Sequence, residues 1–115
     1  MRSFPEWEGG SAEDRALLMH CREAVGAVVP QAEVILYGSR ARGDARADSD
    51  YDVLVVVEGE VDWRLEDQIR QGLYPLELAT GAVITVHAYS REAWGSPLYR
   101  AMPFTQHVER DGIVL

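Results

Sequence analysis

The sequence has little positive charge. It contains 11 lysine and arginine residues against 19 aspartate and glutamate residues, which gives a formal net charge of −8. A protein that holds nucleic acid by its backbone usually has a basic surface, so this balance argues against direct nucleic-acid binding. A single nucleotide stays compatible with an acidic protein, because a metal ion and a few local donors can meet its phosphates.

Cysteine and long apolar runs are also scarce. Cys21 is the only cysteine, so no internal disulfide can form, which favours a reducing cytoplasm. The acidic N-terminal stretch has no apolar segment of the kind found in secretory signals. No apolar run approaches the roughly 20 residues that span a bilayer. We therefore expect a cytoplasmic protein that is not associated with membranes.

The length of 115 residues suits one compact domain. Residues 1–10 contain Pro5, Gly9 and Gly10, and we expect them to form a loose lead-in to a single domain over 11–115. No internal repeat or low-complexity segment interrupts that domain.

Apolar periodicity predicts an α/β (α+β) chain with a small sheet. Ser11 is a good N-cap for a first helix that Pro30 ends. Strands are predicted over 33–37, 52–57 and 82–89, and the continuous apolar run of the second implies that both of its faces are covered. Four further helices are predicted: a turn or two within 39–45, about three turns from Asp62 weakened by Gly72 and Pro75, a short helix capped by Ser90, and one ending near Gly112.

Two carboxylates stand at the start of the second strand. Asp50 and Asp52 are two residues apart, so a strand presents both side chains to one side. Paired carboxylates repel unless a cation lies between them, and a hard divalent ion such as Mg²⁺ is the natural partner. The alternative is that Asp50 simply caps a turn before the strand.

A Gly-Ser pair follows the first strand. Gly38 lets a phosphate approach the backbone closely, and Ser39 offers a hydroxyl at the junction of a strand with a helix. Arg40 and Arg42 can add positive charge, or can instead pair with Asp44 or Asp48 on the surface. A phosphate cradle and a metal pair separated by ten residues suit phosphoryl or nucleotidyl transfer.

The stretch GSRARGDARADSDYDVLVV resembles the signature of the minimal nucleotidyltransferases of the DNA polymerase β superfamily. The similarity covers residues 34–57 and includes both flanking strands. It implies a polymerase-β-type fold, a mixed sheet covered by helices. It also implies NTP, with ATP the expected substrate, Mg²⁺, and transfer of a nucleoside monophosphate to an acceptor. By this resemblance Ser39 contacts phosphate, and Asp50 and Asp52 are catalytic metal ligands.

Small members of that family often act as antitoxins encoded beside a ribonuclease toxin with a HEPN domain, and some add AMP to a tyrosine of the toxin. The resemblance therefore implies a protein partner that supplies the acceptor hydroxyl. A nucleotidyltransferase that modifies an antibiotic is disfavoured, because such enzymes need a further domain to hold the sugar.

The sequence departs from the family pattern at its third acidic residue, which is expected on the strand over 82–89. That run contains no Asp or Glu, and its polar interior residues are Thr85 and His87. His87 can act as a base at neutral pH, or serve only a structural role. Two interpretations stay open: a transferase with weakened catalysis, and a nucleotide-binding module that acts by occluding its partner.

Overall fold

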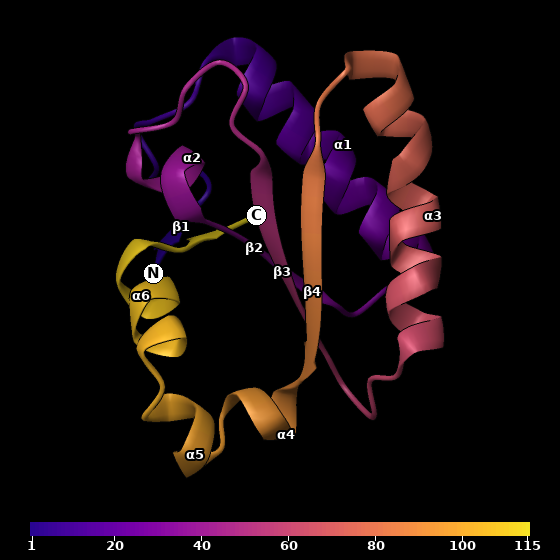
Figure 1. The fold of residues 1–115 in the computed structure, drawn as a ribbon, viewed down its shortest axis with the longest axis vertical. Helices are drawn as coiled ribbons and strands as arrows, with labels where there is room; N and C mark the ends of the chain where they lie inside the picture. The colour runs from indigo at the N-terminus through magenta and orange to yellow at the C-terminus, as the bar shows by residue number, and fades with distance from the viewer.

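The three β-rich runs of the sequence form three adjacent strands of a five-stranded mixed sheet (Figure 1). The computed structural model describes all of residues 1–115. The strand order is β1-β5-β2-β3-β4, with β3 antiparallel to β2 and parallel to β4. The strands are β1 (Arg2–Ser3), β2 (Glu33–Tyr37), β3 (Tyr51–Val57), β4 (Ile84–Ser90) and β5 (Ile113–Val114). The predicted sheet with flanking helices is confirmed, and the predicted strand ends agree to within two residues.

Side-chain caps start most of the helices. Ser11 and Asp14 form a capping box at the start of the first helix, and Asp62, Ser90 and Ser96 each accept a backbone N–H at the start of a later one. The helices are α1 (Ala12–Val28), α2 (Gly38–Arg42), α3 (Trp63–Thr80), α4 (Arg91–Trp94), α5 (Pro97–Arg100) and α6 (Pro103–Asp111).

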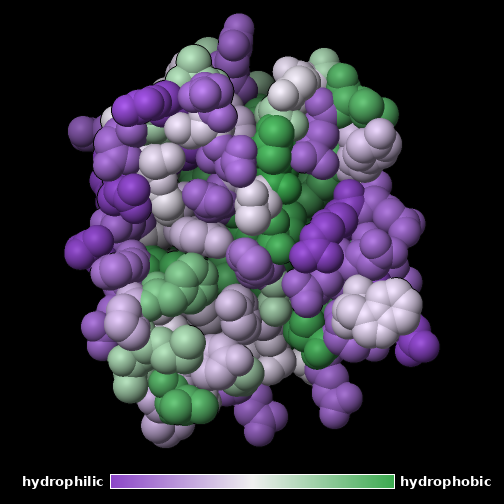
Figure 2. Space-filling view, in the orientation of Figure 1, coloured by the Kyte–Doolittle hydropathy of each residue, from purple (hydrophilic) through white to green (hydrophobic).

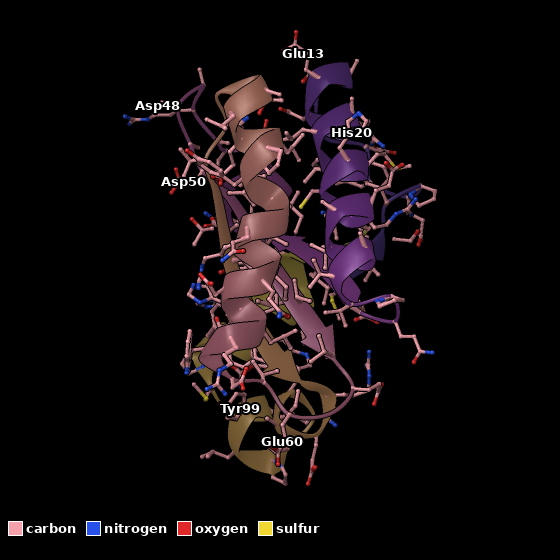
Figure 3. All side chains as sticks on the ribbon, turned by 90° about the vertical axis from the view of Figure 1, so that its right-hand side faces the viewer. Glu13, His20, Asp48, Asp50, Glu60 and Tyr99 are labelled. Atoms are coloured by element: carbon pink, nitrogen blue, oxygen red, sulfur yellow. The ribbon has the colours of Figure 1, made fainter.

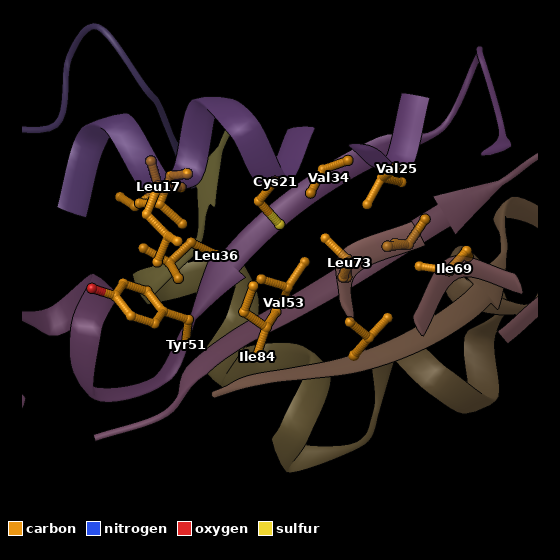
Figure 4. Packing of buried hydrophobic residues seen from close by; sticks show 14 of the residues in the cluster. Leu17, Cys21, Val25, Val34, Leu36, Tyr51, Val53, Ile69, Leu73 and Ile84 are labelled. Atoms are coloured by element: carbon orange, nitrogen blue, oxygen red, sulfur yellow. The ribbon is translucent and has the colours of Figure 1, made fainter. Parts of the chain in front are cut away.

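The main hydrophobic core lies between the sheet and the layer formed by α1 and α3 (Figure 4). Alternate residues of β3, such as Val53 and Val55, point into this core, together with Cys21 of α1 and Leu73 of α3. Each fully buried aliphatic side chain of this kind stabilises the fold by about 1.5–3 kcal/mol.

A second, smaller core lies on the opposite face of the sheet. Leu54 and Val56 of β3 pack there with Trp94 of α4 and Val108 of α6. Both faces of β3 are therefore covered along most of its length, as its continuous apolar run predicts. The cover is incomplete where β3 and β4 begin, because Asp52 and Thr85 are only partly buried and His87 is exposed. This end of the second face is therefore open to solvent.

Two segments differ from the sequence-based expectation. Helix α3 has 18 residues and continues through Gly72 and Pro75, because burial of Ile69 and Leu73 outweighs the low helix propensity of those two residues. Residues 1–10 are packed rather than loose. β1 pairs in parallel with β5, and Trp7 is only 4% exposed within the main core.

No helix of the chain is both long and apolar enough to cross a membrane.

Candidate functional site

The two carboxylates at the start of β3 lie on the open face of the sheet. Asp52 is the second residue of β3 and stands opposite Tyr37 of β2 and Thr85 of β4. Asp50 precedes the strand, and its Oδ2 accepts a hydrogen bond of 3.4 Å from the Thr85 hydroxyl. Figure 3 shows Asp50 on the side of the molecule away from α1. Because Tyr51 between them points into the main core, Asp50 and Asp52 share the opposite side.

Gly38 touches the Asp52 carboxylate directly. Its φ is +76°, and a Cβ built on it would lie 2.3 Å from Asp52 Oδ2. Any side chain at position 38 would therefore displace the carboxylate, in addition to straining the backbone. The structure thus brings the Gly-Ser turn and the Asp-x-Asp pair into contact, although ten residues separate Ser39 from Asp50.

Ser39 lies in the first turn of α2, and its hydroxyl makes no hydrogen bond within the chain. Tyr37, the N-cap of α2, makes no side-chain capping bond, in contrast to the caps of α1 and α3. A hydroxyl and backbone N–H groups at this turn remain available to an anion.

The pKa of Asp52 is raised above its usual value. Partial burial is the largest cause and the nearby Asp50 charge adds to it, whereas His87 and Arg42 act in the opposite direction. Burial and the Asp52 charge also raise the pKa of the Tyr37 phenol to about 12. A cation beside the carboxylate pair would relieve this repulsion, so the two oxygen-donor groups fit a hard divalent ion.

No third acidic residue joins the pair. The chain contains no cluster of three or more His, Cys, Asp or Glu side chains placed to hold a metal ion. The acidic residues near the preceding helix have local roles: Asp62 caps α3, Asp67 accepts from Gln71, and Glu77 accepts the backbone N–H of Ile84. Thr85, which lies beside Asp52, is the residue that contacts the pair from β4.

His87 lies on the same face of β4 as Thr85, two residues further along the edge strand. It stands opposite Leu54, is exposed to solvent, and is close enough to influence the pKa of Asp52. The structure therefore brings His87 to the open face that carries both carboxylates.

The two arginines after Ser39 occupy different environments. The Arg40 side chain is 14% exposed, and its guanidinium bonds to the Ser49 carbonyl and to Asp14 rather than to Asp44 or Asp48. Arg42 is 43% exposed and pairs with Asp44 at 3.2 Å, and it remains beside Gly38.

A small pocket between α2 and α6 was not foreseen from the sequence. Its volume is about 200 Å³, and Gly38 and Arg42 line one side while Phe104 and His107 of α6 line the other. Figure 2 shows this face of the molecule, with hydrophobic residues gathered at the lower left over α5. No local sequence signal links α6 to Gly38, because the two meet only through the packing of α6 against β2 and β3.

The comparison with protein families identifies the class of this chain. The family model for the nucleotidyltransferase domain matches residues 18–101, a range that includes the Gly-Ser turn, both aspartates and β4. The chain belongs to the nucleotidyltransferase domain family. Members of this family generally use an NTP and a divalent metal ion.

A solved structure supports the fold. The chain is similar to one described as the crystal structure of a toxin–antitoxin with AMP-PNP, with a TM-score of 0.59 and 17% sequence identity. The match covers 84% of this chain and 69% of the other. The predicted nucleotidyltransferase fold is thereby confirmed. No curated protein sequence matches the chain.

Proposed function

We propose that this protein binds an NTP, with ATP the expected one, together with Mg²⁺. It transfers the nucleoside monophosphate to a hydroxyl of a partner protein, so that the bond between the α- and β-phosphates breaks and pyrophosphate leaves. The observation that carries the proposal is the close approach of Gly38 to the Asp52 carboxylate, which supports a phosphate site at the Gly-Ser turn directly beside a metal site at the carboxylate pair. Asp50 lies on the same side and is held by Thr85.

In this proposal, one group of residues binds the phosphates of the NTP and another binds the metal ion. The Ser39 hydroxyl and the backbone at Gly38 meet phosphate oxygens, and Arg42 adds a positive charge from the end of α2. Asp50 and Asp52 bind the metal ion, which supplies neutralisation of the triphosphate charge. In-line transfer gains most from such neutralisation and from holding the acceptor in position.

His87 is the candidate for accepting the proton of the attacking hydroxyl. It is exposed on the open face, where an acceptor can reach it, and no acidic residue of β4 competes for that role. General-base assistance is typically worth about 10²–10⁴-fold in rate. An imidazole in place of a third carboxylate provides the base but leaves a second metal ion incompletely bound, so we expect slow transfer.

The acceptor is proposed to be a toxin of the HEPN ribonuclease class, and the transferred group AMP. Two observations support a protein partner. The similar structure is described as a toxin–antitoxin with AMP-PNP, and two large apolar residues, Leu98 of α5 and Met102 before α6, are exposed. The net charge of −8 favours a basic partner.

A second candidate function follows from the missing third carboxylate. A nucleotide-binding antitoxin that silences its partner by occlusion needs the phosphate turn and the metal pair but no complete catalytic centre. The absence of any three-residue cluster of metal-binding side chains favours this alternative.

Calorimetry with ATP and Mg²⁺ tests the binding part of the proposal. Asp50→Asn removes one metal-binding charge with little change in volume, and we expect affinity to fall at least about tenfold, or 1.4 kcal/mol. Asp48→Asn is the matched control, because Asp48 is exposed in the same segment and its substitution also removes one negative charge. Equal affinity in wild type and Asp50→Asn would show that the carboxylate pair is not the site.

Mass spectrometry of the partner separates the two candidate functions. The partner is incubated with the protein, ATP and Mg²⁺, and a covalently attached nucleoside monophosphate supports transfer. His87→Ala should slow that transfer while leaving ATP affinity nearly unchanged. A partner that is inhibited yet unmodified would favour occlusion.

A further inference from the structure

We propose that Arg40 is a positioning residue that fixes the segment 44–50 and so holds Asp50 beside Asp52. The proposal deepens the proposed metal site and rests on it for its functional consequence. Its structural part stands on contacts within the chain. We define the brace as Asp14, Arg40 and Tyr51, three residues from α1, α2 and β3 that contact one another.

Arg40 bonds to the backbone immediately before Asp50. Its Nη2 donates to the Ser49 carbonyl at 2.8 Å and to the Ala47 carbonyl at 3.3 Å, and its Nε reaches the Ser49 carbonyl at 3.3 Å. One guanidinium thus satisfies two carbonyl groups of a segment that contains no helix or strand.

The other side of Arg40 is anchored to the rigid part of the fold. Its guanidinium lies 4.2 Å from the centre of the Tyr51 ring, and Nη1 is 3.4 Å from Asp14 Oδ1. The Tyr51 hydroxyl donates to the same Asp14 oxygen at 2.6 Å. Tyr51 is buried, and Asp14 belongs to the capping box of α1. The brace therefore ties the segment to both α1 and β3.

Asp50 needs such support because it lies outside the sheet. The hydrogen bonding that joins β3 to the β4 side begins at Tyr51, whose N–H donates to the Val83 carbonyl at 2.9 Å. The side chain of Asp50 accepts one hydrogen bond within the chain, from the Thr85 hydroxyl at 3.4 Å. Asp52 is fixed by its place in β3, so the relative position of the two carboxylates depends on the segment that Arg40 holds.

Amide hydrogen exchange tests the structural part without any nucleotide. The Ser49 N–H, bonded to the Arg46 carbonyl at 3.0 Å, is the reporter within the segment. We expect Arg40→Gln to raise exchange at Ser49 about tenfold or more while amides of β2 and β3 stay protected. Tyr51→Phe, a milder variant that removes only the hydroxyl, should raise it less.

Arg46→Gln is the matched control. Arg46 lies in the same segment, carries the same charge, and makes no side-chain hydrogen bond or ion pair within the chain. Unchanged exchange at Ser49 in Arg40→Gln, or an equal rise in Arg46→Gln, would overturn the proposal.

The Mg²⁺ dependence of ATP binding tests the functional part. Loss of a residue that orients a metal ligand typically costs about 10–100-fold in metal affinity. We expect Arg40→Gln to need at least about tenfold more Mg²⁺ for half-maximal ATP binding, with near wild-type ATP affinity restored at saturating Mg²⁺. A loss of ATP affinity that excess Mg²⁺ does not restore would indicate a direct phosphate contact and would overturn the positioning role.

Failure of the proposed function can be distinguished from failure of the positioning role of Arg40. If the wild-type protein binds no ATP, the proposed function is wrong, and the exchange experiment still decides whether Arg40 holds the segment. If the wild-type protein binds ATP but Arg40→Gln leaves amide exchange at Ser49 unchanged, the proposed function is retained and the positioning role of Arg40 is wrong.

Discussion

At the scale of single residues, the contact between Gly38 and Asp52 explains why glycine is needed beside the carboxylate pair. The sequence suggests that Gly38 lets a phosphate approach the backbone. The structure adds a second requirement, because the space that a Cβ would occupy is taken by Asp52 Oδ2. One residue thus shapes both the proposed phosphate turn and the proposed metal pair.

Alanine substitutions at Gly38 and Gly81 separate the cost of a positive φ from the cost of a steric clash with Asp52. Gly38→Ala should destabilise the fold by more than the roughly 1–2 kcal/mol expected for a positive φ alone, and should weaken ATP binding. Gly81→Ala is the control, since Gly81 has a φ of +74° but nothing within 4 Å of its Cβ position. Urea unfolding and calorimetry measure the two effects. Equal destabilisation by both variants would contradict the collision with Asp52.

The raised pKa of Asp52 predicts a cost in stability at neutral pH. For a carboxyl whose folded pKa is raised, the native state is most favoured below the unfolded pKa and loses stability as pH rises through the folded pKa. Asp52→Asn should therefore stabilise the free protein at pH 7 by about 0.5 kcal/mol, since Asp52 is partly solvated. The gain should shrink toward pH 3.5.

Thermal unfolding at several pH values checks this prediction. A gain of this size corresponds to a rise in Tm of about 2–4 °C for a domain of this length. The same substitution should abolish the stabilisation that ATP and Mg²⁺ give to the wild type. A variant less stable than wild type at pH 7 without ligand would show that Asp52 carries a structural role.

At the scale of elements, the packing of α1 against α3 allows α3 to continue past Gly72 and Pro75. Propensity alone predicts about three turns, because Gly72 and Pro75 weaken the helix. Close approach of the two helices offsets that weakness, since a Cβ on Gly72 would lie 3.2 Å from Val28 Cγ2 at the end of α1. The neighbouring helix thus accounts for the continuity of α3, whereas Asp62 and Gly81 cap its two ends.

Two glycines in these helices provide a paired test. Gly26 of α1 has nothing within 4 Å of its Cβ position, so Gly26→Ala should stabilise the protein by about 0.5–1 kcal/mol. Gly72→Ala should give less than half of that gain, because Val28 must move. Both helices lie on the face opposite the carboxylates, so ATP affinity should stay unchanged. Equal gains in chemical denaturation would show that the helices can separate freely.

At the scale of the whole molecule, acidic charge and the proposed partner are connected. A net charge of −8 on 115 residues creates a field that steers a basic partner toward it. Pairing of β1 with β5 fixes the two ends of the chain within the sheet, at the edge away from β4 (Figure 1). His87 lies on β4, at the opposite edge of the sheet.

The salt dependence of association tests this steering. We expect the association rate with the proposed partner to fall about tenfold or more between roughly 0.02 M and 0.3 M salt, with a smaller change in the dissociation rate. Stopped-flow mixing gives the rates, and light scattering of the co-expressed pair gives the stoichiometry. A purely monomeric protein after co-expression would count against the partner, and a salt-independent rate against steering.

The sequence by itself predicted the central strands, the short helix after Gly38 and the covered faces of β3. It could do so because strand periodicity, turn glycines and the spacing from Gly38 to Asp52 are local properties of the chain. The same spacing indicated the nucleotidyltransferase family, which the family comparison confirmed for residues 18–101. The roles of Ser39, Asp50, Asp52 and His87 stay predictions.

Only the tertiary structure decided the contacts between distant segments. Arg40 meets Asp14, which lies 26 residues earlier, and Phe104 and His107 reach Gly38 from the far end of the chain. Trp7 is buried although its neighbours Pro5, Gly9 and Gly10 suggest a loose segment. Such contacts depend on how helices and strands pack in three dimensions. The periodicity of one segment does not predict which distant side chain will contact that segment.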